Sequence, residues 1–266
     1  LNAAFNLSAG PTVQVAAPNP NSGLGQGVFG VDRSNGSGYS QQWNLNVQRQ
    51  LTKDTVLEVG TGPGTLTRFL AARAGQVLTV EMDPELLAFA RQELLGLDTI
   101  RFFPADVLDG KGALNPALVD ELRRLGPFKL VANLTYSIVT PLLLLLFASV
   151  LEVRLAIATV QKEVALRLGA APGTKEYGPA TVVLAFWATM EKIRTLPAGA
   201  FWPPPKVTSE VVRITPRPEP LGDPALFPPV QAWAHRLLRH RRKQVGGILR
   251  GLLGPGRAVK ALGILG

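Results

Sequence analysis

The chain has 266 residues, of which 46% are hydrophobic, and can therefore bury the core of one large domain with room for a small appendage. It has no cysteine and two histidines, which excludes disulfides, thiolate metal sites and histidine-rich metal sites. The formal net charge of +9 at pH 7 favours a partner that carries phosphates.

No stretch of the sequence predicts a membrane span or a secretion signal. The longest apolar stretch, residues 141–150, is far shorter than the ~20 residues that a membrane-spanning helix needs, so we interpret it as a buried helix. The beginning of the chain, Leu1-Asn2-Ala3, lacks a basic stretch followed by an apolar core, so no intact signal peptide is expected. We expect a cytoplasmic monomer that binds neither metal nor membrane.

Residues 1–50 differ in composition from the rest of the chain, since they hold seven of its nine asparagines. Apolar residues at 43, 45 and 47 alternate with amides at 44, 46 and 48, which is typical of a strand with one apolar and one wet face. The segment resembles a strand of TonB-dependent-receptor-like outer-membrane proteins. We expect it to be poorly ordered and separate from the catalytic fold; a diverged lid with a disordered extension is the alternative.

From residue 55 onward, short apolar runs alternate with amphipathic segments, as strands and helices do in βαβ units. We expect strands at 55–59, 76–81, 100–104, 128–132 and 156–161, and helices at 65–74, 84–95, 116–125, 141–150 and from about 163. This alternation predicts an α/β domain over residues 51–215, with a Rossmann-like, mostly parallel, doubly wound sheet.

The last part of the chain contains a rigid loop, a strand and a basic piece. Consecutive prolines at 203–205 exclude a helix or a central strand, and residues 207–214 then alternate as a strand. Prolines at 216, 218 and 220 predict a stiff linker into a small helical domain, 221–266. Residues 224–266 contain no acidic residue, whereas a solvated helix face usually mixes charge signs. The expected RNA-binding residues are Arg239, Arg241, Arg242 and Lys243.

A glycine-rich turn follows the first expected strand, at Gly60, Gly62 and Gly64, and lets the backbone approach a ligand. Glu81 ends the second strand, where a carboxylate can accept both hydroxyls of a ribose. These features fit a nicotinamide dinucleotide as well as S-adenosylmethionine. Glu58 favours the latter, because a carboxylate beside the turn repels a pyrophosphate and attracts an ammonium and a sulfonium.

A third acid, Asp106, lies just past the third strand and is placed to accept from an adenine amino group. The alternative is that Glu58 and Asp106 merely cap helices, and a nicotinamide oxidoreductase is the most distant alternative function. The expected cofactor-binding residues are Glu58, Gly60, Gly62, Gly64, Glu81, Met82, Asp106, Val107 and Asn133.

The sequence after the fourth strand, Asn133-Leu134-Thr135-Tyr136, resembles the Asn-Leu-Pro-Tyr motif of adenine-N6 methyltransferases. Further motifs at 161–165, 172–178, 201–207 and 241–243 follow in the order of the KsgA (RsmA) ribosomal RNA adenine dimethyltransferases, which the chain resembles from about residue 55 to its end. The resemblance implies a class I methyltransferase fold and S-adenosylmethionine as cofactor. It also implies N6-dimethylation of adenosines in small-subunit (16S) ribosomal RNA and a role in ribosome assembly.

The same resemblance assigns the catalytic residues. The Asn133 side-chain oxygen and the Leu134 carbonyl accept the two N6 hydrogens, so that the amine is positioned without a general base. Tyr136 stacks on one face of the extruded base and Phe201 closes the other. The alternative for both aromatic residues is an ordinary place in the core.

Two departures from the family keep other functions open. Thr135 stands where the family has proline, and the family's N-terminal lid motif is present only in altered form at 24–32. A catalytically weakened RNA-binding assembly factor on the same scaffold is therefore one alternative. An Erm-like enzyme of large-subunit RNA is the closest rival, although the Tyr177-Gly178 pair and the Phe-x-Pro-Pro-Pro-Lys-Val run at 201–207 favour KsgA.

Overall fold

The computed structural model describes residues 54–110, 112–134, 137–201, 205–238 and 245–253. Several expectations fall outside them. These are the separate segment 1–50, the altered lid at 24–32, Thr135, Tyr136, Arg239, Arg241, Arg242 and Lys243.

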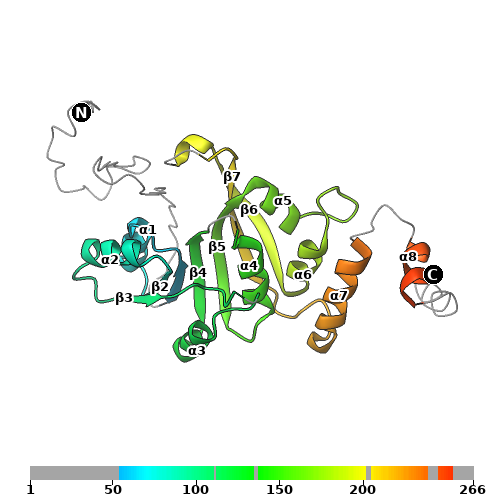
Figure 1. Ribbon diagram of the computed structural model, residues 1–266, viewed down its shortest axis with the longest axis horizontal. Helices are drawn as coiled ribbons and strands as arrows, with labels where there is room; N and C mark the ends of the chain where they lie inside the picture. Colours follow the sequence, from blue (N-terminus) through cyan, green and yellow to red (C-terminus); the bar gives the residue numbers. More distant parts are fainter. Residues whose placement is uncertain (1–53, 111, 135–136, 202–204, 239–244, 254–266) are drawn as a thin grey trace.

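Seven strands form one sheet in the order β3-β2-β1-β4-β5-β7-β6 (Figure 1). The first five are mutually parallel, and β7 runs antiparallel to both β5 and β6. The sequence analysis expected this mostly parallel, doubly wound sheet. The strands are β1 Thr55–Val59, β2 Gln76–Glu81, β3 Ile100–Pro104, β4 Phe128–Asn133, β5 Val153–Gln161, β6 Ala188–Leu196 and β7 Ser209–Pro216.

Helices connect the strands, and several begin at residues suited to starting a helix. The Asp83 carboxylate accepts the N–H groups of Glu85 and Leu86 at the start of α2, and Asn115 accepts that of Ala117 at the start of α3. In the described chain, no helix is long and apolar enough to cross a membrane. The helices are α1 Thr65–Ala71, α2 Pro84–Glu93, α3 Pro116–Leu125, α4 Val139–Ala148, α5 Lys162–Leu168, α6 Pro179–Trp187, α7 Phe227–Leu238 and α8 Val245–Leu253, with short 3-10 turns at Ala198–Ala200 and Pro224–Leu226.

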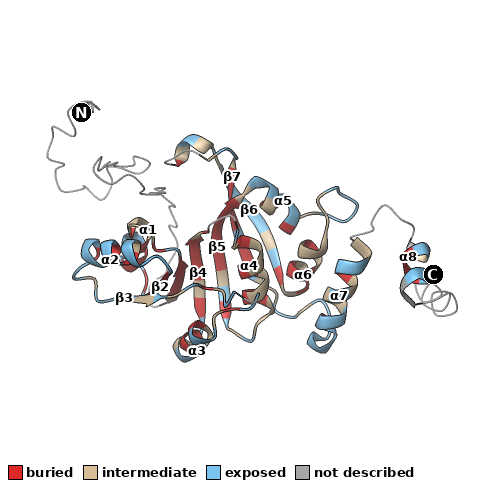
Figure 2. Ribbon diagram, viewed as in Figure 1, coloured by how far each residue is buried: buried red, intermediate tan, exposed pale blue. Residues whose placement is uncertain are grey.

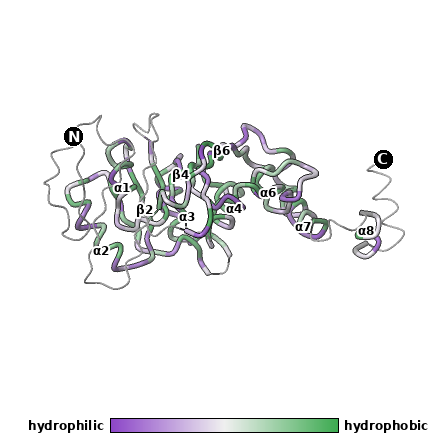
Figure 3. The backbone as a smooth tube through the Cα atoms, turned by 90° about the horizontal axis from the view of Figure 1, so that it is seen from above, coloured by the Kyte–Doolittle hydropathy of each residue, from purple (hydrophilic) through white to green (hydrophobic). Residues whose placement is uncertain are grey.

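The sequence analysis left residues 179–196 unassigned, and these form α6 and β6. α6 consists mostly of apolar residues, as its colour in Figure 3 shows. These residues follow no clear amphipathic period. β6 is an edge strand with mostly exposed side chains, so it lacks the apolar pattern of a buried strand. Neither element therefore produces the usual sequence signal.

The sheet separates two apolar clusters, and the central strands are buried (Figure 2). The larger cluster includes Leu142, Leu143 and Leu146 of α4, which confirms a buried helix in the apolar run at 141–150. The helix begins two residues earlier than expected and ends at Ala148, and Val150 is exposed. On the other face, Val56 and Val77 pack with residues of α1. Both faces of the sheet are therefore covered, and the functional surface is restricted to its edges.

The helix α7 packs directly on α6. The Phe227 ring lies with its centroid 5.2 Å from that of Phe186 and 5.1 Å from that of Trp187. These rings and Val183 form a third buried cluster. The first helix of the basic C-terminal piece is thus held by aromatic contacts against the domain that carries the sheet.

Candidate functional site

A cavity of about 350 Å³ opens at the carboxyl ends of β1, β2, β3 and β4. It lies where the strand order reverses, because the chain leaves β1 toward β2 on one side while β4 pairs with β1 on the other (Figure 1). Open α/β sheets bind ligands at such a point. The lining residues are Val59, Gly60, Thr61, Gly62, Pro63, Thr65, Leu66, Val80, Glu81, Met82, Leu86, Ala105, Asp106, Val107, Asn133 and Ile138.

Two glycines of the turn after β1 line this cavity in left-handed backbone conformations. Gly60 has φ 81° and Gly62 has φ 52°, values that side-chain-bearing residues rarely adopt. The Gly60 N–H donates to the Val80 carbonyl at 2.8 Å, which ties the turn to β2. A Cβ on Gly60 would lie 3.8 Å from the Asn133 carbonyl oxygen, so the turn also lies against the end of β4.

Gly64 has a packing role and is absent from the cavity lining. Its φ is 82°, and a Cβ there would come within 2.8 Å of the Leu94 Cδ1 atom just after α2. Leu94 is buried, so this glycine lets α1 begin close to the end of α2. The sequence analysis placed all three glycines around the ligand, but the structure brings only Gly60 and Gly62 there.

Glu81 joins the turn to the end of β2. Its Oε2 accepts the Gly62 N–H at 3.0 Å, and its Oε1 accepts the Asp83 N–H at 3.0 Å. A carboxylate has about four lone-pair positions, so each oxygen retains capacity for a ligand. The side chain is 8% exposed and lines the cavity beside Met82, in agreement with its expected place.

Glu58 lies behind the turn rather than in the cavity, which corrects the expected placement of its carboxylate. Its Oε2 accepts the hydroxyls of Thr67 and Thr79, both at 2.7 Å, and the side chain is fully buried. Successive strand residues point to opposite faces, and position 58 points to the face that α1 covers. Burial raises the pKa of Glu58 to about 8, so the group is mainly neutral at pH 7.

The threonines around Glu58 connect it to the cavity, and the sequence analysis missed them. The Thr79 hydroxyl bonds that of Thr61 at 2.7 Å, and Thr61 lines the cavity. Glu58 therefore supports the glycine turn indirectly, through Thr79 and Thr61. A sequence signal existed, because a buried acid at an inner strand position requires hydrogen-bonding partners.

Asp106 and Val107 both line the cavity. The Asp106 Oδ1 accepts the Leu108 N–H at 3.0 Å, and the Asn115 side-chain amide donates to the Asp106 carbonyl at 3.0 Å. These bonds fix the turn after β3 and leave the carboxylate exposed at the cavity. Asn115, and not Asp106, caps the next helix.

Asn133 ends β4 and lines the cavity, and in the sheet it pairs with Thr159 of β5. Leu134 follows it and is buried. Phe201 is also buried, and it lies directly after the 3-10 turn Ala198–Ala200, outside the cavity lining. The structure therefore brings Asn133 to the expected cofactor residues, while Phe201 belongs to the neighbouring loop between β6 and β7.

Comparison with protein families gives two matches. Residues 41–262 match the family model described as ribosomal RNA adenine dimethylase. Residues 2–61 match a model described as an outer membrane beta barrel domain, and the two matches overlap at 41–61.

Similar curated proteins bear the name ribosomal RNA small subunit methyltransferase A. The chain is 37% identical to that of Levilactobacillus brevis over 222 residues, which cover 79% of this chain and 73% of the relative. It is 39% identical to that of Geobacillus kaustophilus, covering 64% of this chain and 58% of the relative. A probable enzyme of the same name from Methanopyrus kandleri is 37% identical, with 74% and 66% covered. The chain thus spans between 58% and 73% of these relatives.

Solved structures of methyltransferases have a similar backbone. A dimethyladenosine transferase from Plasmodium falciparum superposes with a TM-score of 0.63 at 24% identity, covering 76% of this chain and 68% of that one. The 23S rRNA methyltransferase ErmE superposes with a TM-score of 0.59 at 27% identity, covering 79% and 80%.

Proposed function

The chain belongs to the ribosomal RNA adenine dimethylase family, and we propose that it transfers methyl groups from S-adenosylmethionine to N6 of adenosines in small-subunit ribosomal RNA. Its fold is the Rossmann-like class I methyltransferase fold. The observation that carries the proposal is that one cavity gathers Gly62, Glu81, Asp106 and Asn133 at neighbouring strand ends.

The residues of the cavity fit S-adenosylmethionine. A volume of about 350 Å³ lies within the range of small-molecule sites, and Leu66, Leu86 and Ile138 supply apolar walls for an adenine. We assign the ribose hydroxyls to Glu81, whose carboxylate oxygens retain free lone pairs, and the adenine amino group to the exposed Asp106 carboxylate. The bound cofactor supplies an activated methyl group on a sulfonium.

The protein's contribution to the reaction is to hold the target amine. The lone pair of an aromatic amine is delocalised into its ring, so the amine must be oriented toward the methyl group. We assign the Asn133 side-chain oxygen and the Leu134 carbonyl as acceptors of the two N6 hydrogens. A Cβ on Gly60 would lie 3.8 Å from the Asn133 carbonyl oxygen, so the glycine turn proposed for the methyl donor and the strand end proposed for its acceptor are adjacent. Such positioning supplies most of the rate.

The experiment that tests the function is methyl transfer from labelled S-adenosylmethionine to unmethylated small ribosomal subunits. We expect label in N6-dimethyladenosine of the small-subunit RNA, identified by mass spectrometry of its nucleosides. Label in large-subunit RNA instead would favour the second candidate, an Erm-like enzyme, which the likeness to ErmE supports. Tight binding to the particle without incorporation would favour a non-catalytic assembly factor.

A further inference from the structure

The loop that carries Phe201 leaves the sheet from a hairpin of β6 and β7. β6 ends at Leu196 and β7 begins at Ser209, and these two residues are the last pair in register before the loop. The Lys162 N–H donates to the Thr208 carbonyl at 3.0 Å, which ties the returning chain to the end of β5. β5 pairs in turn with β4 next to Asn133. The base of the loop is therefore connected through the sheet to the methyl-transfer site.

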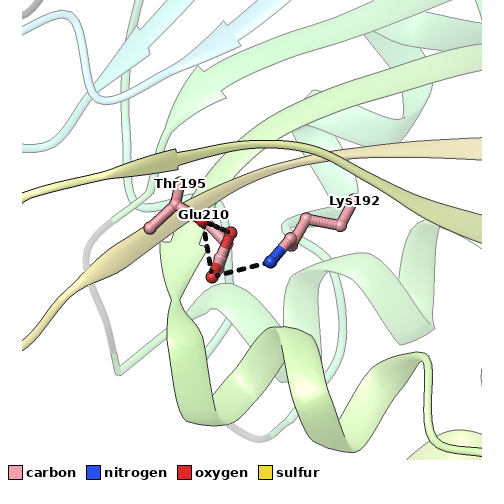
Figure 4. Close-up of polar contacts among 3 residues, drawn as sticks. All are labelled: Lys192, Thr195 and Glu210. Atoms are coloured by element: carbon pink, nitrogen blue, oxygen red, sulfur yellow. Dashed lines mark hydrogen bonds and ion pairs between the residues drawn. The ribbon is translucent and has the colours of Figure 1, made fainter.

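A buried carboxylate lies at the base of this loop. Glu210 is the second residue of β7 and is 2% exposed. It accepts the Thr195 hydroxyl at 3.2 Å from Oε1 and 3.0 Å from Oε2, and the Lys192 ammonium lies 3.5 Å from Oε1 (Figure 4). Glu210 thus joins both strands of the hairpin immediately before the loop begins.

The contacts of Glu210 depend on an irregularity in β6. Lys192 pairs with Val212 and Arg194 with Val211, so Ile193 is an extra residue, as in a β-bulge. Beyond the bulge, Thr195 lies opposite Glu210. A regular ladder would place Arg194 opposite Glu210 and shift Thr195 to Ser209. A one-residue slip exchanges the faces of all following side chains, and it would change where the loop starts.

Stability alone does not account for a carboxylate at this position. The next residues of β7 on the same face, Val212 and Ile214, are buried and apolar, and an apolar residue at 210 would pack with them. Glu210 is buried but the Lys192 side chain is 57% exposed, so their ion pair is screened by solvent and adds little stability. The best-attested use of a buried polar or ionic group is to fix a register. Thr195 and Lys192 can reach Glu210 together in the bulged register.

We propose that Glu210 is a positioning residue for RNA binding: by bonding Thr195 and Lys192 it fixes the bulged register of the hairpin and thereby the place where the loop that carries Phe201 leaves the sheet. The inference rests on the proposed function and on the family resemblance, which implies that Phe201 closes over the target base. Glu210 acts only through the loop and touches neither cofactor nor base.

The test compares hairpin variants of the full chain. Thr195→Val removes the hydroxyl at nearly constant volume, and Glu210→Gln keeps an oxygen acceptor for Thr195 but removes the charge. Glu191→Gln is the matched control, because Glu191 also bonds across the hairpin, to Arg213 at 2.6 Å, but on the opposite face and farther from the loop. The readouts are kcat and KM with small ribosomal subunits, affinity for S-adenosylhomocysteine, and hydrogen exchange of residues 190–212.

We expect Thr195→Val to raise KM for the subunit about tenfold, as misplaced binding groups do, and to speed exchange at the loop base. Cofactor affinity should stay within twofold of the unaltered chain, on the order of 0.4 kcal/mol. Glu210→Gln should lie between Thr195→Val and the unaltered chain, and Glu191→Gln should match the unaltered chain. An unchanged KM in Thr195→Val, or an equal effect of Glu191→Gln, would overturn the inference. If the unaltered chain methylates no subunit, the proposed function fails and this inference fails with it.

Discussion

At the scale of single residues, folding changes the protonation of Glu58, because it buries this carboxyl group. Burial raises its pKa to about 8 from 4.5, so between these values the folded chain keeps a proton that the unfolded chain releases. The stability associated with this proton is fully present below pH 4.5 and is lost as the pH rises toward 8. We expect Glu58→Gln, which still accepts from Thr67 and Thr79, to remove this fall.

The measurement is chemical denaturation of both chains at several pH values across that window. The difference between their free energies of unfolding isolates residue 58, because the other titrating groups are shared. Glu58→Gln should gain stability relative to the unaltered chain as the pH rises. Parallel curves for the two chains would mean that Glu58 is ionised in the folded state.

Asn133 is the residue on which catalysis should depend most. We predict that Asn133→Ala abolishes methyl transfer while cofactor affinity stays within roughly tenfold, about 1.4 kcal/mol, because the main partner of the side chain is the target amine. Single-turnover methyl transfer and calorimetric binding of S-adenosylhomocysteine measure the two effects separately. Near-normal turnover of the variant would show that Asn133 does not hold the target amine.

At the scale of elements, the helix α7 leads directly into the basic stretch at 239–243. We propose that Arg239, Arg241, Arg242 and Lys243 bind RNA phosphates. Changing them to glutamine should weaken RNA binding and flatten its salt dependence by about 0.7 to 0.9 log–log units for each phosphate that is no longer neutralised. Filter binding over a range of salt concentrations measures this slope.

The control for that experiment removes cations elsewhere on the surface. Arg123 and Arg154 are exposed and each is paired with a carboxylate, so their replacement by glutamine should leave the salt slope unchanged. If the changes at 239–243 also left the salt dependence of RNA binding unchanged, the basic stretch would be a solvated surface that does not bind RNA phosphates.

At the scale of the whole molecule, two family matches meet within residues 41–61. We propose that residues 1–50 are not part of the catalytic fold. A fusion of two unrelated sequences within residues 41–61 would explain why both family models match there. A chain that starts near Gln50 should then match the full chain in melting temperature and in affinity for S-adenosylhomocysteine, and limited proteolysis of the full chain should cut before Leu51. A melting temperature lower by several degrees would show instead that the segment packs on the catalytic domain.

Local patterns in the sequence determined the parallel sheet, the turn at Gly60 and Gly62, and the place of Asn133 at a strand end. Strand and helix periodicity, a glycine's freedom at positive φ and the common edge of parallel strands each act over a few residues. They needed no knowledge of distant contacts. The apolar helix α4, Val139–Ala148, was recognisable for the same reason, because its composition is that of a core element.

Only the tertiary structure decided the roles of Glu58, Gly64 and Glu210. Glu58 faces α1 and two threonines instead of the ligand, and its raised pKa follows from that burial. Gly64 is required by Leu94, which lies 30 positions along the chain. A bulge in β6 brings Thr195 opposite Glu210. β6 is an edge strand without alternating apolar residues, so the sequence did not indicate this pairing. In each case the deciding atoms belong to another element, and their distance is set by how the sheet and helices pack.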